Sequence, residues 1–151
     1  MKKALVATVA MLIGGLLYIS LRSESLAMFR WFAMLGVQDE VHAVRALTSA
    51  QLGRLPGWVY LSLPQALWYF SGLLGFECIW SVNAATTRER RAWILAFSGL
   101  ALGLEIGQWL GLVPGRFDPL DLVLLLVAWS VAAAISSLGR RRLLNSQIGD
   151  L

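Results

Sequence analysis

Long stretches with almost no charge constrain this chain more than any other feature of its sequence. Three stretches contain no Asp, Glu, Lys or Arg, and they cover residues 4–21, 55–76 and 122–139. A fourth, residues 92–115, contains only Glu105. Each is close to or above the ~18 apolar residues that mark a membrane-spanning helix. The sequence therefore predicts an all-α integral membrane bundle of four transmembrane helices.

We place the predicted spans at about residues 4–21, 57–82, 92–112 and 120–138, within one membrane domain covering residues 1–151. Pro64 removes a backbone donor, so it predicts a kink or a helix start inside the second span. Asp118 and Pro119 suit the N-cap and the first turn of the last helix. We expect that helix to stop at Gly139, before a short frayed tail.

Hydrophobic residues make up 58% of the chain and charged residues 15%, against about 45–50% and about 25% in soluble domains. This composition excludes a disordered tail and disfavours a soluble globular domain. The net charge is +4, but the basic residues flank apolar runs and are not interleaved with exposed aromatic residues. We therefore interpret the charge as topological, with membrane lipids as partners and no nucleic acid.

Basic residues also predict the orientation, because cytoplasmic loops carry the excess of Lys and Arg. Eight of them cluster at helix ends on one side: Lys2, Lys3, Arg88, Arg90, Arg91, Arg140, Arg141 and Arg142. Five are spread over the other side: Arg22, Arg30, Arg45, Arg54 and Arg116. We expect a multi-pass protein of the bacterial inner membrane with both termini cytoplasmic. The first run lacks a clean cleavage site, so it is predicted to stay as an uncleaved span.

The segment between the first two spans has two parts. Leu26–Val37 is apolar, rich in aromatic residues and too short to span. It predicts either an amphipathic helix lying in the outer interface or a short helix packed onto the bundle. Gln38–Arg54 is more polar, and we expect an outer loop that is partly helical.

Small residues mark two predicted packing sites. Gly14 and Gly15 would let a neighbour approach the first helix. The third helix carries a glycine at every fourth position: Gly99, Gly103, Gly107 and Gly111. We predict that this row packs against the second or fourth helix.

Acidic residues inside spans are costly and usually face the bundle interior. Glu77 lies near the inner end of the second helix, where we expect it to pair with the basic loop over residues 83–91. Glu105 lies in the outer half of the third helix. It is predicted to join a polar cluster at the outer face: Gln65, Glu105, Gln108, Arg116, Asp118 and Asp121. Two interpretations stay open, a buried ion-pair network around Glu105 and Arg116, or a site for a head group or partner.

The sequence gives little support for a disulfide, a catalytic triad or a metal site. Cys78 is the single cysteine and lies in an apolar run, so it is predicted to be a small buried hydrophobe. His42 is the single histidine and lies outside the predicted cluster, which leaves no Ser-His-Asp set there. No Cys/His group has metal-ligand spacing, and we expect no metal and no cofactor.

The polar cluster resembles the VanZ-like family of small bacterial membrane proteins. The resemblance rests on Glu105-x-x-Gln108, on Gly115-Arg116 and on Asp121, and on the run from Ser62 to Trp68. Members often have an acid where Gln65 stands, and an Asn and a Gly where this chain has Leu125 and Ala128. The resemblance implies a multi-helix inner-membrane protein of the cell envelope, in a family whose founding member is linked to glycopeptide-antibiotic resistance.

Three function classes remain from the sequence. The first is an accessory or scaffold subunit that binds an envelope membrane protein or a lipid. The second is an enzyme acting on a lipid-linked envelope substrate at the outer leaflet with Glu105, Arg116 and Asp121. The third, a transporter, is disfavoured because four helices with one buried acid make a poor conduit. A cavity open at Glu105 would favour the enzyme, and a closed network would favour the accessory subunit.

Overall fold

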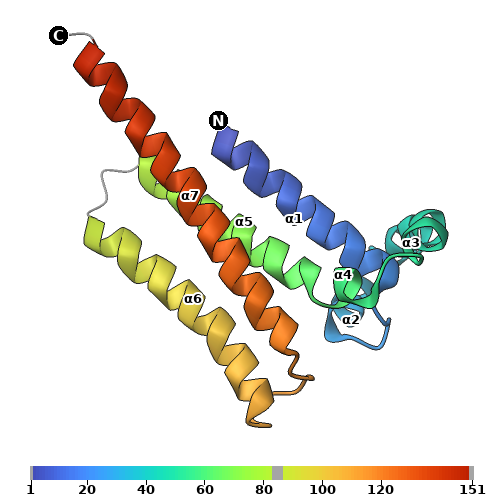
Figure 1. Ribbon diagram of the computed structural model, residues 1–151. Helices are drawn as coiled ribbons and strands as arrows, with labels where there is room; N and C mark the ends of the chain where they lie inside the picture. The colour runs from blue at the N-terminus through green and yellow to red at the C-terminus, as the bar shows by residue number, and fades with distance from the viewer. Residues whose placement is uncertain (1, 83–86, 150–151) are drawn as a thin grey trace.

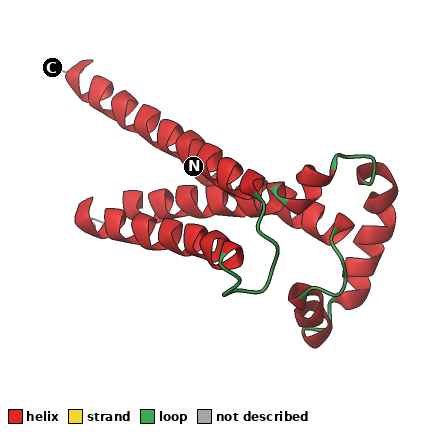
Figure 2. Cartoon of the chain, turned by 60° about the horizontal axis from the view of Figure 1, so that its bottom comes forward, coloured by secondary structure: helices red, strands yellow, loops and turns green. Residues whose placement is uncertain are grey.

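The computed structural model describes residues 2–82 and 87–149, with side chains over residues 2–80 and 88–137. These residues form seven α-helices (Figure 1). They are α1 (Lys2–Leu21), α2 (Ala27–Met34), α3 (Gln38–Leu52), α4 (Gly57–Leu61), α5 (Leu63–Val82), α6 (Thr87–Trp109) and α7 (Pro119–Gly149). The long helices run side by side, and α2, α3 and α4 gather at the end away from both chain termini (Figures 1 and 2). We call these two ends the cap end and the terminal end.

Helix α5 forms the centre of the bundle. Its side chains Leu73 and Leu74 are almost completely buried. They join a core that takes Ala7 from α1 and Leu125 and Ala128 from α7. α5 packs most extensively against α1 and α7, whereas α6 has fewer contacts with either α5 or α7. The helix that the sequence places second is therefore the one around which the others assemble.

Small and polar residues hold α1 against α5. The Ser71 hydroxyl donates to the Ala7 carbonyl at 2.8 Å, and the Trp68 indole donates to the Met11 carbonyl at 3.3 Å. A Cβ at Gly14 would lie 2.8 Å from the Trp68 indole nitrogen, so a larger residue there would push the two helices apart. Such close approach and cross-helix hydrogen bonding are common in membrane helix pairs, and the close approach expected at Gly14 is confirmed. A Cβ at Gly15 would meet open space.

Three of the described helices are long and apolar enough to cross a membrane, namely α1, α6 over residues 88–109 and α7 over residues 119–137. They indicate a multi-pass membrane protein. α5 is not one of these three, although it is 20 residues long. Polar and aromatic side chains of α5, including Trp68 and Ser71, contact α1.

Helix boundaries differ from the predicted ones where local backbone chemistry decides. The second predicted helix is divided at Ser62 into α4 and α5, and Pro64 lies in the first turn of α5. The helix start expected near this proline is therefore confirmed. α6 ends at Trp109, earlier than predicted, and Gly111 follows with φ +70°, a conformation that terminates helices and favours glycine.

Two predictions about the basic segments were wrong. Residues 88–91 lie in the first turns of α6 and not in a loop, while residues 83–86 lie outside the described chain. α7 continues through Gly139 to Gly149. A single glycine costs a helix only about 1 kcal/mol, and the Arg and Leu residues that follow are good helix formers, so Gly139 does not act as a stop.

The cap consists of α2, α3 and α4. α2 packs on the bundle through Phe29, which is buried and stacks on Tyr18 with ring centroids 6.0 Å apart. α3 is a full helix where a partly helical loop was expected. Arg45 of α3 donates to the carbonyls of Ile19 and Arg22 at 2.9 and 2.8 Å, so it satisfies acceptors at the end of α1 that the helix itself leaves open.

Candidate functional site

Glu105 is the most deeply buried ionisable residue of the predicted cluster, with no exposed surface. The Gln65 side-chain amide of α5 donates to its Oε1 at 2.6 Å. The sequence placed both residues at similar depth on neighbouring helices, and the structure brings them together. The second oxygen, Oε2, is buried without a hydrogen-bond partner among the described residues. Gln65 therefore contacts one oxygen of a carboxyl group that forms no ion pair with a cation among the described residues.

Asp121 lies beside this pair in the first turn of α7. The Ser62 hydroxyl hydrogen-bonds to its carboxyl group, and Ser62 itself is 2% exposed. Glu105 and Asp121 act on each other electrostatically, and Asp118 acts on both. Three acidic side chains therefore gather where α5, α6 and α7 meet at the cap end.

Asp118 has a structural task of its own. Its Oδ1 accepts a hydrogen bond from the Leu120 backbone amide at 2.9 Å, and Pro119 occupies the first position of α7. This is the N-cap that the sequence predicted, and it satisfies a backbone donor that α7 cannot satisfy itself.

The cation near this cluster is Arg22 and not Arg116. Arg22, just past the end of α1, is in electrostatic range of Asp121, and its guanidinium lies 5.8 Å from the centre of the Tyr18 ring. Arg116 is exposed, and no ion pair joins it to an acid within the described residues. The predicted network of Glu105 and Arg116 was therefore wrong, because the turn after α6 leaves the Arg116 side chain outside the bundle.

Gln108 also differs from its predicted role. Its side chain lies against the turn, where a Cβ at Gly115 would come within 2.7 Å of the Gln108 amide. Gly115 has φ +141°, a backbone conformation that glycine adopts without strain. Gln108 therefore packs on the turn, while Gln65 provides the amide that reaches Glu105.

The glycine row of α6 does not pack against another helix in the described chain. A Cβ at Gly99, Gly103 or Gly111 would meet nothing within 4 Å, and at Gly107 it would meet only Val113 of the following turn. The predicted contact with the second or fourth helix was wrong. α6 turns its Glu105 side toward the bundle, and the glycines lie on a different face of the same helix.

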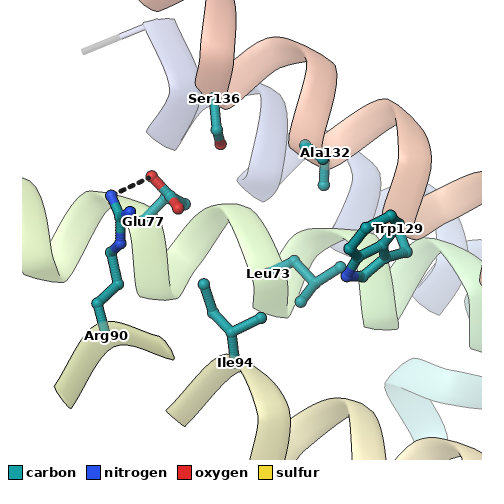
Figure 3. A pocket seen from close by; sticks show the side chains of 8 residues that line it. Leu73, Glu77, Arg90, Ile94, Trp129, Ala132 and Ser136 are labelled. Atoms are coloured by element: carbon teal, nitrogen blue, oxygen red, sulfur yellow. Dashed lines mark ion pairs between the residues drawn. The ribbon is translucent and has the colours of Figure 1, made fainter. Parts of the chain in front are cut away.

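A second polar group lies at the terminal end. Glu77 of α5 pairs with Arg90 of α6 at 3.7 Å and with Lys3 of α1 at 4.0 Å. The expected pairing of Glu77 with the basic segment after its helix is confirmed through Arg90. Beside this pair, a cavity of about 140 Å³ opens between α5, α6 and α7 (Figure 3). It is lined by Leu73, Glu77, Arg90, Ile94, Trp129, Ala132, Ala133 and Ser136.

What the acids of the cap-end cluster can do depends on whether they line a cavity and whether they could hold a metal ion. Neither Glu105 nor Asp121 lines any of the three best-formed cavities among the described residues. No set of three His, Cys, Asp or Glu side chains in this part of the chain has a geometry suited to a metal ion. The cluster therefore links α5, α6 and α7, with Glu105 fully buried, Asp121 partly exposed and Asp118 exposed at the surface.

The chain matches no known protein-family model, no curated protein and no solved structure.

Sequence reasoning missed Ser62, Arg22 and Ser136 at these two polar groups. Ser62 precedes the predicted proline start, and a hydroxyl at a helix junction is a usable signal because such residues cap and bridge. Arg22 ends the first apolar run, so it was assigned to topology alone. Ser136 is one serine in an apolar helix, and its burial follows only from the packing of α7 on α5.

Proposed function

We propose that this protein is a VanZ-like, four-span protein of the bacterial cell envelope that acts as an accessory subunit binding a lipid or a membrane partner at its outer face. In this proposal α5 also crosses the membrane, in addition to α1, α6 and α7, because about 20 residues at 1.5 Å each reach across the ~30 Å hydrocarbon core. The terminal end faces the cytoplasm and the cap end faces outward.

The complete burial of Glu105 is the observation that favours a binding protein over an enzyme. A carboxyl group that transfers protons to a substrate must be reached by that substrate. Glu105 is fully buried and Gln65 occupies one of its oxygens. The buried polar contacts instead fit a device that fixes how α5, α6 and α7 pack, which would give the outer face a defined shape.

An apolar groove at the cap end supplies the binding surface. It has a volume of about 700 Å³ and lies between α1, α2 and α5. Its lining includes Gly15 and Leu16 of α1, Phe32 of α2, and Trp68 and Gly72 of α5. Apolar pockets of this size accept a substantial hydrocarbon ligand, and we assign the groove to a hydrocarbon chain of an envelope lipid.

Filling the groove tests this assignment. Gly15→Leu adds a side chain into open space on α1, and Gly99→Leu is the matched control on α6, where a Cβ is equally unobstructed. Membranes containing a phospholipid with a photoreactive acyl chain should label α1, α2 and α5 around the groove. We expect Gly15→Leu to lower that labelling at least fivefold and Gly99→Leu to leave it unchanged. Equal labelling of all helices in both variants would contradict the groove.

Reporter fusions test the orientation. A reporter after Leu151 should report the cytoplasm, and one inserted within residues 48–53, at the end of α3, should report the outer side. The basic residues that oppose this orientation include Arg45 and Arg22, which the bundle uses for capping and ring contact. If both reporters give the same side, the four-span arrangement is wrong.

A further inference from the structure

The cavity at the terminal end contains polar groups whose hydrogen-bonding capacity is unused. The Ser136 hydroxyl is buried, with 3% of the residue exposed, and it has no partner among the described residues. The Arg90 Nε is likewise buried without a partner. Figure 3 shows Ser136 reaching from α7 toward the Glu77–Arg90 pair across the cavity. Buried donors without partners carry a cost of about 1–3 kcal/mol each, so they indicate a missing acceptor.

The conformation of Ser136 sets it apart from serines elsewhere in the helices. Ser20 and Ser130 donate to the carbonyl four residues earlier, and Ser137 donates to the carbonyl three residues earlier. This internal bond is the usual way for a serine to satisfy its hydroxyl in an apolar helix. Ser136 lacks it and directs its hydroxyl into the cavity, where a ligand oxygen would satisfy it.

Charge and shape narrow the ligand to an anionic amphiphile. The charges of Glu77 and Arg90, which line the cavity, cancel when both are ionised, and Lys3 pairs with Glu77 from α1 outside the lining, which gives the three side chains a net charge of +1. The Arg90 Nε–H can only donate. The polar groups occupy one side of the cavity, while Leu73, Ile94 and Trp129 form apolar walls on the other. The volume of about 140 Å³ exceeds the ~10–15 Å³ that one water needs, and waters along the apolar walls would lack the 2–4 polar partners that buried water requires.

We propose that this cavity binds the phosphate group of an anionic phospholipid from the leaflet at the terminal end. One phosphate oxygen accepts from the Arg90 Nε and another from the Ser136 hydroxyl. The glycerol backbone and the start of an acyl chain lie along Ile94 and Trp129, between α6 and α7. The site is separate from the cap-end groove, so it stands whether or not the proposed function does. It would also fill the space beside α6, which has few protein contacts of its own.

Native mass spectrometry of the full chain in detergent tests the proposal, with phosphatidylglycerol, phosphatidylcholine and inorganic phosphate as probes. Ser136→Leu fills the cavity, and Ser130→Leu is the matched control at an exposed position of the same helix. We expect the natural chain to retain one phosphatidylglycerol at least tenfold better than phosphatidylcholine. Ser136→Leu should lower this retention at least tenfold, and Ser130→Leu should not change it.

Two milder variants keep the test valid if Ser136→Leu fails to fold. Ser136→Ala removes only the hydroxyl, and Arg90→Lys keeps a positive charge beside Glu77 while removing the Nε–H donor. Each should lower phosphatidylglycerol retention several-fold without changing the melting temperature in lipid-free detergent. Retention unchanged in both variants would overturn the proposal. Equal retention of the two lipids would overturn the anion preference, and displacement of phosphatidylglycerol by millimolar inorganic phosphate would show that free phosphate is the ligand.

Discussion

Glu105 and Glu77 lie on neighbouring helices at opposite ends of the bundle, and different partners hold them. The residues that mark the two sites on α5, Gln65 and Glu77, are about 18 Å apart at 1.5 Å per residue. At the cap end, Glu105 receives a hydrogen bond from a neutral amide and lies among other acids. At the terminal end, Glu77 lies between two cations. We call the Glu105 site sealed because Glu105 has no exposed surface, and the Glu77 site open because Glu77 lines a cavity.

This difference shows how a membrane bundle can accommodate an acid in two ways. A carboxyl group beside cations keeps its charge at little cost, and the long cationic side chains leave space around it. The Gln65 amide satisfies only one Glu105 oxygen, and the other is buried without a partner among the described residues, which is expensive in a low-dielectric interior. The sealed site then contributes mainly to helix packing, while the open site is the one that can accept a ligand.

The largest expected effect is at the sealed site. Glu105→Ala removes the acceptor of the Gln65 amide and leaves a cavity, so it should lower the free energy of unfolding by about 3 kcal/mol. Glu105→Gln keeps an oxygen that can accept from Gln65 and should cost less than about 1 kcal/mol. Thermal unfolding in detergent, followed by circular dichroism, measures both. An alanine variant as stable as the glutamine variant would show that the site is not tightly packed.

A smaller effect is expected when the open site loses a cation. Arg90→Ala leaves Glu77 with Lys3 alone, and we expect a loss of about 2 kcal/mol. This is below the ~3–5 kcal/mol for breaking a fully buried ion pair, because all three side chains are partly exposed. Arg88→Ala is the control, because Arg88 lies two residues before Arg90 in α6 and is exposed, and it should change stability by less than about 0.5 kcal/mol. Equal losses of stability in the two variants would show that the Arg90–Glu77 ion pair does not stabilise the bundle.

Arg116→Ala should have almost no effect on stability, within about 0.5 kcal/mol, because the side chain is exposed and makes no ion pair among the described residues. Combined with Glu105→Gln, its effect should be additive. A coupling energy above about 1 kcal/mol in this double-mutant cycle would restore the network that the sequence predicted and would make the two ends of the bundle alike.

The smallest expected effect is on the glycine face of α6. Gly103→Leu should leave the folded yield and the melting temperature unchanged, because its Cβ meets open space. At the cap end, α6 contacts the bundle through the face that carries Glu105. A clear drop in yield would instead show that a second face of α6 is packed.

Sequence reasoning succeeded where a local rule determines the outcome. Asp118 and Pro119 begin α7, and Pro64 lies in the first turn of α5, because capping and proline geometry act within a few residues. The depth of Gln65 and Glu105 along their helices was enough to bring them together. Glu77 pairs with Arg90 because the basic segment follows the helix of Glu77 closely in the sequence.

The errors concern contacts that depend on how whole helices approach one another. A row of glycines permits close packing but does not determine which helix packs against it. In this bundle a Cβ at Gly103 would meet no atom within 4 Å. Arg22 reaches the acidic cluster from α1, far away in the sequence, while Arg116 points outward although it is near in sequence. α5 is the central helix of the bundle because it packs against both α1 and α7, and its apolar sequence alone did not distinguish it from the other predicted spans.

The claim that one end is sealed and the other open is tested most directly by thiol accessibility at two matched serines. Ser62, which bonds to Asp121, and Ser136 are 2% and 3% exposed. Ser136 lines the terminal-end cavity, whereas Ser62 lines none of the three best-formed cavities among the described residues. Ser62→Cys and Ser136→Cys, each in a Cys78→Ala background, would be treated with a small anionic thiol reagent in lipid-free detergent. The account predicts at least tenfold faster modification of the Ser136→Cys variant. Equal rates, or faster modification of the Ser62→Cys variant, would contradict it.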